Sequence, residues 1–210
     1  MRNNQEPSER PVSGRDRLAL AAQKLFRSES YGAVSISCIL EECGLKAPAL
    51  YHHFGDKEGI YLSWGLHAIK QLGDRIDRAI TQNTGRDTAY AIAEGLLKEP
   101  LLDILIMERD IPKLQRPASR NQMQRALEVS VYKPIETWLI ADRSPKSEVP
   151  RLARYIVHSL SLGLPVYGGD QFKGSEGTQW LVERVFSRIA AGSPSPQVSP
   201  DGKVSGPCPT

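Results

Sequence analysis

Residues 35–57, SISCILEECGLKAPALYHHFGDK, decide how this chain of 210 residues is organised. The first half of the stretch has apolar residues at the i, i+3, i+4, i+7 spacing of a short amphipathic helix, namely Ile36, Ile39, Leu40 and Cys43. Gly44 then supplies the positive φ with which a helix stops and turns. In the second half, Leu50 and Phe54 lie one helical turn apart and share a face. Two short helices joined by a glycine turn predict a helix-turn-helix.

The second of these helices offers a surface that suits DNA. With its two large apolar residues turned inward, the small residues at its start would let the helix press into a major groove. Alanine suits a thymine methyl, whereas tyrosine, histidine, serine and lysine suit phosphate oxygens. We predict DNA contacts at Ser35, Ser37, Lys46, Ala47, Pro48, Ala49, Tyr51, His52, His53 and Lys57. The alternatives are that Tyr51 and His53 are packing residues and that the two serines are plain helix caps.

Several short motifs surround this helix-turn-helix. They are Ala21-Ala22-x-x-Leu25-Phe26, Tyr31-Gly32, Ile39, Gly44-Leu45, Leu50-Tyr51-x-His53-Phe54 and Lys57-Glu58. The first belongs to an apolar stripe that predicts a helix over residues 14–30, which would hold the helix-turn-helix at a fixed angle. With these motifs, residues 15–57 resemble the DNA-binding domain of the tetracycline-repressor (TetR) family. Lys46 stands where the family commonly has serine or threonine, so the recognition helix lacks an N-cap bond of about 1 kcal/mol.

The resemblance implies an all-α fold: an N-terminal three-helix bundle with the helix-turn-helix, followed by a larger helical ligand-binding and dimerisation domain. Family members are homodimers joined by a four-helix bundle from the two C-terminal helices, which here would span residues 150–167 and 175–191. Such a dimer would act as a transcriptional repressor that reads a pseudo-palindromic operator in double-stranded DNA. A small-molecule effector, whose identity cannot be read from the residues, would release it by binding the body.

Composition and periodicity divide the chain into four parts. Residues 1–13 and 192–210 are rich in polar residues or proline without periodicity, which predicts disordered tails. We expect residues 14–60 to form the helix-turn-helix DNA-binding domain and residues 61–191 to form the helical body.

A long helix is predicted to connect the two domains over residues 56–82. Asp56 would be its N-cap, and the negative charge of Glu58 in its first turn would interact favourably with the helix dipole. Further along, Pro134 should kink or split a helix over residues 118–143.

Aromatic and polar-tipped residues on the body helices are of the kind that line small-molecule cavities. Our candidates for ligand contacts are Trp64, His67, Met107, Tyr132, Trp138, Tyr155, His158 and Tyr167. For each of them, the alternative is ordinary core packing.

Composition narrows the classes of function. Hydrophobic residues make up 40% and charged residues 24%, as in soluble globular proteins, and no apolar run approaches the roughly 20 residues of a membrane span. Three scattered cysteines suit a reducing compartment, so we expect a cytoplasmic protein. Because no zinc-like spacing, phosphate-binding glycine loop or nucleophile motif appears, we expect no metal, no cofactor and no enzymatic activity.

The charge balance keeps a second function open. The formal net charge is only +3, and residues 15–58 contain six basic and six acidic residues. A protein that held phosphates by charge alone would show a basic excess there. The alternative function is therefore a helical small-molecule-binding or scaffolding protein without specific DNA recognition.

Overall fold

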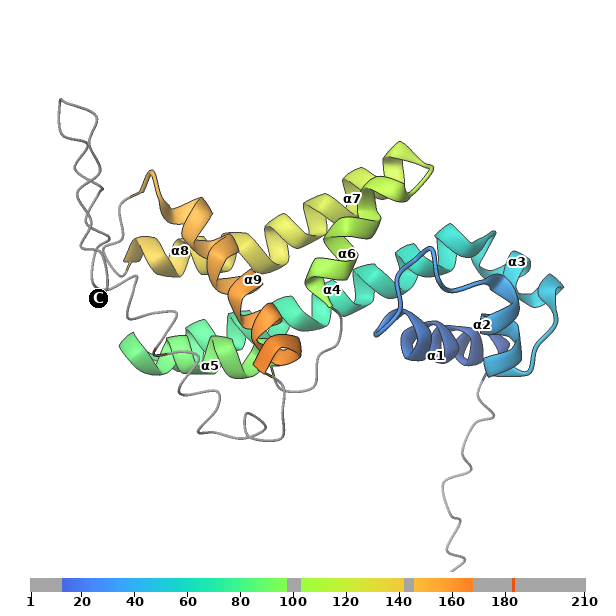
Figure 1. The fold of residues 1–210 in the computed structure, drawn as a ribbon, viewed down its shortest axis with the longest axis horizontal. Helices are drawn as coiled ribbons and strands as arrows, with labels where there is room; N and C mark the ends of the chain where they lie inside the picture. Colours follow the sequence, from blue (N-terminus) through green and yellow to red (C-terminus); the bar gives the residue numbers. More distant parts are fainter. Residues whose placement is uncertain (1–12, 98–102, 142–145, 168–182, 184–210) are drawn as a thin grey trace, which may run out of the picture.

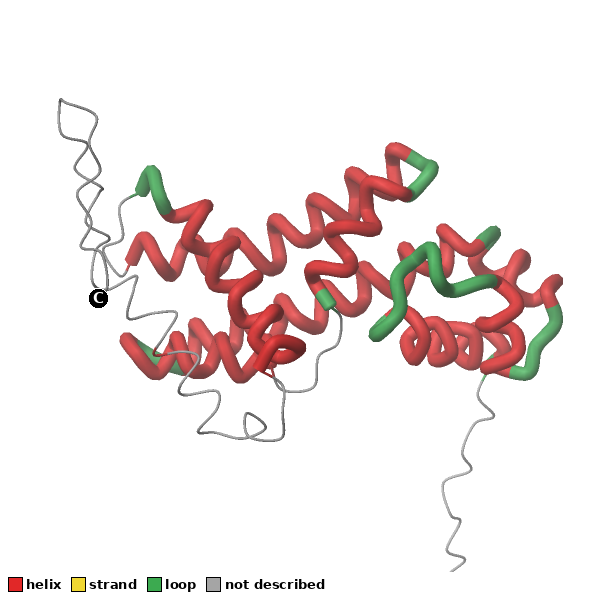
Figure 2. The backbone as a smooth tube through the Cα atoms, in the orientation of Figure 1, coloured by secondary structure: helices red, strands yellow, loops and turns green. Residues whose placement is uncertain are grey.

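The computed structural model describes residues 13–97, 103–141, 146–167 and 183. In these ranges the backbone is helical with connecting turns and contains no strand, which confirms the predicted all-α class (Figure 2). The helices are α1 Gly14–Phe26, α2 Ile36–Cys43, α3 Ala47–Phe54, α4 Lys57–Gln82, α5 Gly85–Leu97, α6 Ile104–Asp110, the 3₁₀ turn η1 Ile111–Lys113, α7 Pro117–Leu127, the π-helix η2 Glu128–Tyr132, α8 Lys133–Ala141 and α9 Val149–Tyr167. None of them combines the length and the hydropathy that a membrane crossing needs.

Helix α4 joins the two ends of the molecule (Figure 1). Near its start it packs against α1 and α3, which together with α2 we call the head. Further along it packs against α5, α7, η2 and α8, which with α6 and α9 form the body. Asp56 caps α4 by accepting the amide of Gly59 at 2.7 Å, as predicted. Ile60, Ile69 and Ile76 are buried along the whole rod, so one continuous core runs through head and body.

Helix α1 is shorter than its apolar stripe predicts. It begins at Gly14 under an N-cap from Ser13, but it ends at Phe26 rather than at Ser30. The chain leaves the helix through a turn, after which the backbone amide of Tyr31 donates to a carboxylate of the body. The predicted end at Ser30 is therefore wrong, and the turn that follows Phe26 brings Tyr31 against α6.

Pro134 splits the predicted helix over 118–143, and the split takes the form of a π-helix. Proline has no amide to donate to the carbonyl four residues earlier, and its ring crowds that carbonyl. The residue four positions before is Ser130, in the widened turn η2 between α7 and α8. Its carbonyl lies against Gly73 of α4. A Cβ added at Gly73 would lie only 2.8 Å from the Ser130 carbonyl oxygen. The glycine lets the π-helix approach α4 closely.

The C-terminal part of the body is described only through α9 and Glu183. Ile156, Val157 and Leu160 of α9 are fully buried within the protomer, whereas the Tyr155 side chain is 45% exposed. These three apolar side chains of α9 are thus covered by the chain itself. The predicted second C-terminal helix, apart from Glu183, and the predicted tails, apart from Ser13, lie outside the described residues.

Replacing Gly73 by alanine should lower the free energy of unfolding by about 1–3 kcal/mol, because the new methyl group would push Ser130 away from α4. Gly95→Ala on α5 is the matched control. An added Cβ there meets its nearest neighbour at an ordinary 3.6 Å, so alanine should stabilise by about 0.5–1 kcal/mol. Urea denaturation of both variants measures the difference, and a neutral Gly73→Ala would contradict the close contact.

Candidate nucleic-acid interface

The helix-turn-helix has the geometry that the sequence predicts. Ser35 caps α2 by accepting the amide of Cys38. Gly44 ends the helix with φ of 65°, and the Leu45 amide then donates to Leu40 at 3.2 Å. Lys46 occupies the N-cap of α3 without a side-chain cap bond, as its side chain predicts. The turn is held by backbone geometry and by buried apolar residues on either side.

Helix α3 presents its polar side to solvent. Leu50 is fully buried beneath it, whereas Tyr51, His52 and His53 are exposed, with 52% of Tyr51 accessible. The two histidine rings stand 4.8 Å apart, edge to face. Of the other predicted contacts, Ser37, Lys46 and Pro48 are exposed, and Ala47 and Ala49 are half-buried. The described part of the body does not cover this face.

Two predicted phosphate contacts have other partners in the protein. Ser35 is exposed, but its hydroxyl serves as the cap of α2. The ammonium of Lys57 lies 4.3 Å from the centre of the Tyr31 ring, where the head meets the body. Burial there lowers the pKa of Lys57, and the nearby Asp110 opposes that effect.

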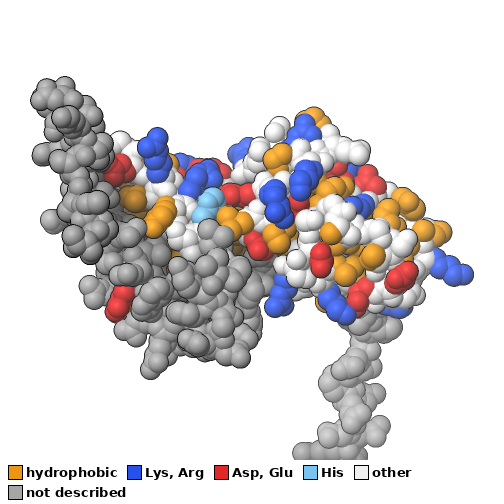
Figure 3. Space-filling view, viewed as in Figure 1, with side chains coloured by type: hydrophobic (Ala, Val, Ile, Leu, Met, Phe, Trp, Pro, Cys, Tyr) orange, Lys and Arg blue, Asp and Glu red, His pale blue; other side chains and the backbone are white. Residues whose placement is uncertain are grey.

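The head has few cations that are not already engaged. Arg17 donates to the carbonyl of Cys43, and Lys24 pairs with Glu42 at 2.7 Å. On the face seen in Figure 3, basic and acidic side chains are interspersed rather than gathered into one basic surface. Any contact of α3 with DNA would therefore depend on shape and on individual hydrogen bonds more than on net charge.

Two buried carboxylates, Asp110 and Glu58, bind backbone amides where the head meets the body, and we call this contact the seam. No sequence pattern predicts it. Asp110, at the end of α6, has no exposed surface; it accepts the Tyr31 amide with one oxygen and the Lys113 ammonium with the other. Glu58, in the first turn of α4, accepts the backbone amides of Gln115 and Arg116. The bonds from Tyr31 and Gln115 span 79 and 57 residues of sequence, so only the folded chain reveals them.

The hydrogen bonds to Glu58 are strong enough to offset its burial. Burial alone would raise its pKa, but donors from Ser119, Arg116 and Gln115 hold the pKa below the ordinary value for glutamate. Arg116 contributes its Nε at 3.0 Å from Glu58, and its Nη2 reaches Asp56 at 3.0 Å. The start of α4 and the start of α7 are thereby tied together.

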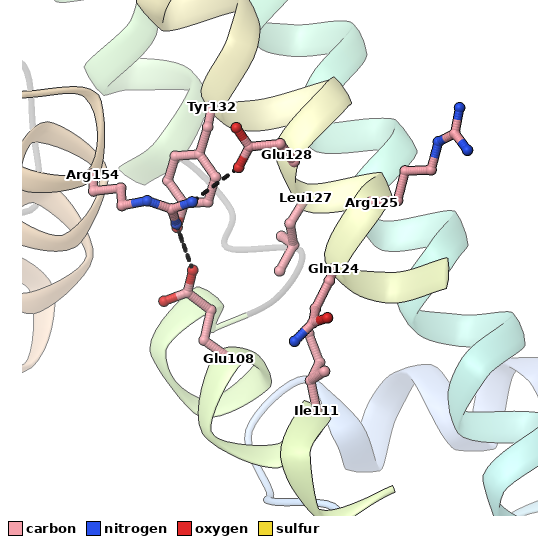
Figure 4. Close-up of a pocket in the computed structure, with 8 residues that line it drawn as sticks. All are labelled: Glu108, Ile111, Gln124, Arg125, Leu127, Glu128, Tyr132 and Arg154. Atoms are coloured by element: carbon pink, nitrogen blue, oxygen red, sulfur yellow. Dashed lines mark hydrogen bonds and ion pairs between the residues drawn. The ribbon is translucent and has the colours of Figure 1, made fainter. Parts of the chain in front are cut away.

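A cavity of about 500 Å³ opens between α6, α7, η2 and α9 (Figure 4). Its walls are Glu108, Ile111, Gln124, Arg125, Leu127, Glu128, Tyr132 and Arg154. Arg154 lies between the two glutamates, 2.9 Å from Glu128 and 3.7 Å from Glu108, and stacks over the Tyr132 ring at 4.2 Å. The side chain of Arg125 points away from this group. The cavity thus combines apolar walls with hydrogen-bonding groups, which suits a small polar molecule.

Only part of the predicted ligand set lies at this cavity. Tyr132 lines it and donates to Glu108 at 2.6 Å, and His158 joins the same glutamate at 2.8 Å. Burial, and then the adjacent Glu108, raises the pKa of the Tyr132 hydroxyl. The remaining predicted residues are elsewhere: Trp64 and Met107 are buried in the core, Trp138 is partly buried, His67 and Tyr155 are exposed, and the side chain of Tyr167 lies outside the described part.

The walls that the sequence did not predict are the apolar residues Ile111 and Leu127 and several charged or amide side chains. Glu108, Glu128 and Arg154 had no distinguishing motif, since such residues are common on solvated helix faces. The positions of Trp64 and Met107 follow the alternative of core packing. The indole Nε1 of Trp64 is buried without a hydrogen-bond partner among the described residues.

Known proteins resemble this chain in the sequence of its N-terminal part and in its fold. Residues 19–63 match the family described as bacterial regulatory proteins, tetR family. The HTH-type transcriptional repressor AcnR of Corynebacterium efficiens is 24% identical over 92 residues, a match that covers 44% of this chain and 45% of that repressor. The HTH-type transcriptional repressor KstR2 of Mycolicibacterium smegmatis is 23% identical over 189 residues, which cover 82% of this chain and 89% of KstR2.

A solved structure has the same fold. The TetR family transcriptional regulator PfmR of Thermus thermophilus superposes with a TM-score of 0.62 at 20% identity, and the match covers 86% of this chain and 100% of PfmR. The comparisons support a TetR-family transcriptional regulator, with the family match over residues 19–63. The matched segment contains α2 and α3 entirely and reaches into α4.

Tyr132→Phe should lower the free energy of unfolding by about 1.5–3 kcal/mol, because it removes a buried hydroxyl that donates to a carboxylate. Tyr90→Phe is the control, since the Tyr90 hydroxyl makes an exposed and long contact of 3.4 Å with Glu183. Chemical denaturation followed by circular dichroism measures both. Equal, small effects of the two substitutions would show that the cluster around Glu108 is not a stabilising network.

Proposed function

We propose that the protein is a sequence-specific DNA-binding transcriptional regulator that acts as a repressor. The outward face of α3 carries the proposal, because a short helix with exposed tyrosine and histidine and small residues at its start is free to enter a major groove. The contacts are made by the predicted residues without another partner role, with Tyr51 and His53 on phosphates and Ala47 or Ala49 against a thymine methyl; Ser35 and Lys57 are left out. The relatives that are named transcriptional repressors support this interpretation.

The regulator works as a cytoplasmic homodimer on a pseudo-palindromic operator. The two C-terminal helices form the dimer interface, and exposed Tyr155 on α9 is a large apolar side chain available for it. Two-fold symmetry sets the two recognition helices about one DNA turn or more apart. The family is a regulatory one, and we assign no enzymatic activity to this chain.

A small-molecule effector binds in the body and changes the affinity for DNA. The cavity offers a place for it, and Glu108 on its wall is two residues from Asp110, which holds the head. A ligand that displaces Glu108 from Tyr132 and His158 would shift α6 and thus the support of Tyr31. Such a ligand changes the DNA-competent population only through its different affinities for the two states.

The balanced charges of the head favour one alternative, a small-molecule-binding or scaffolding protein without specific DNA recognition. Selection of bound sequences from random duplexes, repeated at two salt concentrations with competitor DNA, separates the two. A repressor should enrich a two-fold symmetric site whose preference survives competitor. Enrichment of no sequence would favour the alternative.

Tyr51→Phe should weaken binding to the selected site about 2- to 10-fold, since it deletes one phosphate hydrogen bond worth about 0.5–1.5 kcal/mol. The exposed hydroxyl makes no hydrogen bond within the described structure, so folding should be unchanged. Tyr90→Phe, which deletes a hydroxyl on α5 outside the proposed DNA contacts, is the control and should bind DNA like the unmodified protein. Unchanged affinity of the Tyr51 variant in a fluorescence anisotropy titration would remove Tyr51 from the interface.

A further inference from the structure

We propose that Asp110 and Glu58 are positioning residues that fix the angle between head and body and thereby set the spacing of half-sites the dimer accepts. The inference rests on the proposed DNA binding and deepens it. It assigns a function to two buried carboxylates that neither belong to the proposed DNA contacts nor line the cavity.

Asp110 reaches from the body into the head. It belongs to α6, and its Oδ2 accepts the backbone amide of Tyr31, in the loop between α1 and α2. Its Oδ1 accepts the Lys113 ammonium at 2.8 Å. A carboxylate without solvent access is costly unless donors surround it, so each of these bonds resists being broken. Movement of the head away from α6 would leave a buried charge with fewer donors.

Glu58 reaches in the opposite direction, from the start of α4 to the corner before α7. It accepts the amides of Gln115 at 2.8 Å and Arg116 at 3.2 Å, and the Arg116 Nε at 3.0 Å. Arg116 is the N-cap of α7, and its own side chain does not cap that helix. The amides at this corner are therefore satisfied by a residue from another element.

Two attachment points restrain the head more than one would. The bond at Tyr31 holds the loop of the head against α6, and the bonds at Arg116 hold the first turn of α4, on which α1 and α3 pack, against the start of α7. The chain passes from head to body through α4, so these bonds supply the lateral support that sets the angle of the head. In a symmetric dimer, any twist is doubled across the two-fold axis and changes the distance between the recognition helices.

The substitutions Asp110→Asn and Glu58→Gln test the proposal because each replaces one acceptor oxygen by an amide that cannot accept. In Asp110→Asn, the amide group must face either the Tyr31 amide or Lys113. In Glu58→Gln, it must face the donors of either Gln115 or Arg116. Asp74→Asn is the matched control, since the Asp74 carboxylate forms an exposed pair with Lys70 within α4.

The experiment uses the full chain and the operator selected from random duplexes, with the spacer between half-sites shortened or lengthened by one base pair. We expect the unmodified protein to prefer one spacing by about tenfold or more, which corresponds to about 1.4 kcal/mol. Both variants should lower this ratio to about threefold or less while keeping their circular dichroism spectra and their half-site preference. Asp74→Asn should keep the full ratio.

Variants that keep the spacing ratio of the unmodified protein would overturn the proposal, and so would an equal loss of the ratio in Asp74→Asn. If either buried variant fails to fold, Arg116→Lys replaces it, because this half-exposed side chain would lose its fork of contacts to Glu58 and Asp56 without burying a new charge. It too should lower the ratio, and an unchanged ratio would count against the proposal. Selection of no operator by the unmodified protein would instead contradict the proposed DNA binding.

Discussion

The pairing of buried charge at the seam is the constraint on which the rest of this structure depends. Asp110 and Glu58 are withdrawn from water, and each accepts backbone amides from an element on the other side of the contact between head and body. Apolar packing along α4 would tolerate small rotations, because it has no direction. Hydrogen bonds to fixed backbone amides have a direction, so they oppose such rotations. The head therefore has one preferred angle on the body.

This constraint connects the two places where ligands would bind. Helix α6 has seven residues, with Glu108 on the cavity wall and Asp110 at the seam. Because both residues belong to this one short helix, the proposed effector could alter the angle of the head by displacing α6. With its position supported by the body, α3 could make the proposed DNA contacts by shape and by single hydrogen bonds, with few charges of its own.

Local structure was predictable, and contacts between distant residues were not. Gly44, Asp56 and Lys46 act through their immediate neighbours, so the turn, the start of α4 and the missing cap of α3 followed from the sequence. Pro134 marked the break before α8, but not that a π-helix would accommodate it. From the sequence, Glu58 was predicted only to interact with the dipole of its own helix. Its hydrogen bond to the Gln115 amide joins residues 57 positions apart, which no local pattern reveals. Most of the cavity walls, other than Tyr132, were missed because they come together only in the folded chain.

Native-state hydrogen exchange at the backbone amide of Tyr31 tests the central claim most directly. This amide lies in a turn outside any helix, where exchange is normally fast, and the structure gives it a buried carboxylate as acceptor. The account predicts that it exchanges as slowly as amides in the middle of α4, and that the amide of exposed Gly32 beside it exchanges quickly. Equal, fast exchange at both positions would show that the head is not held at the seam.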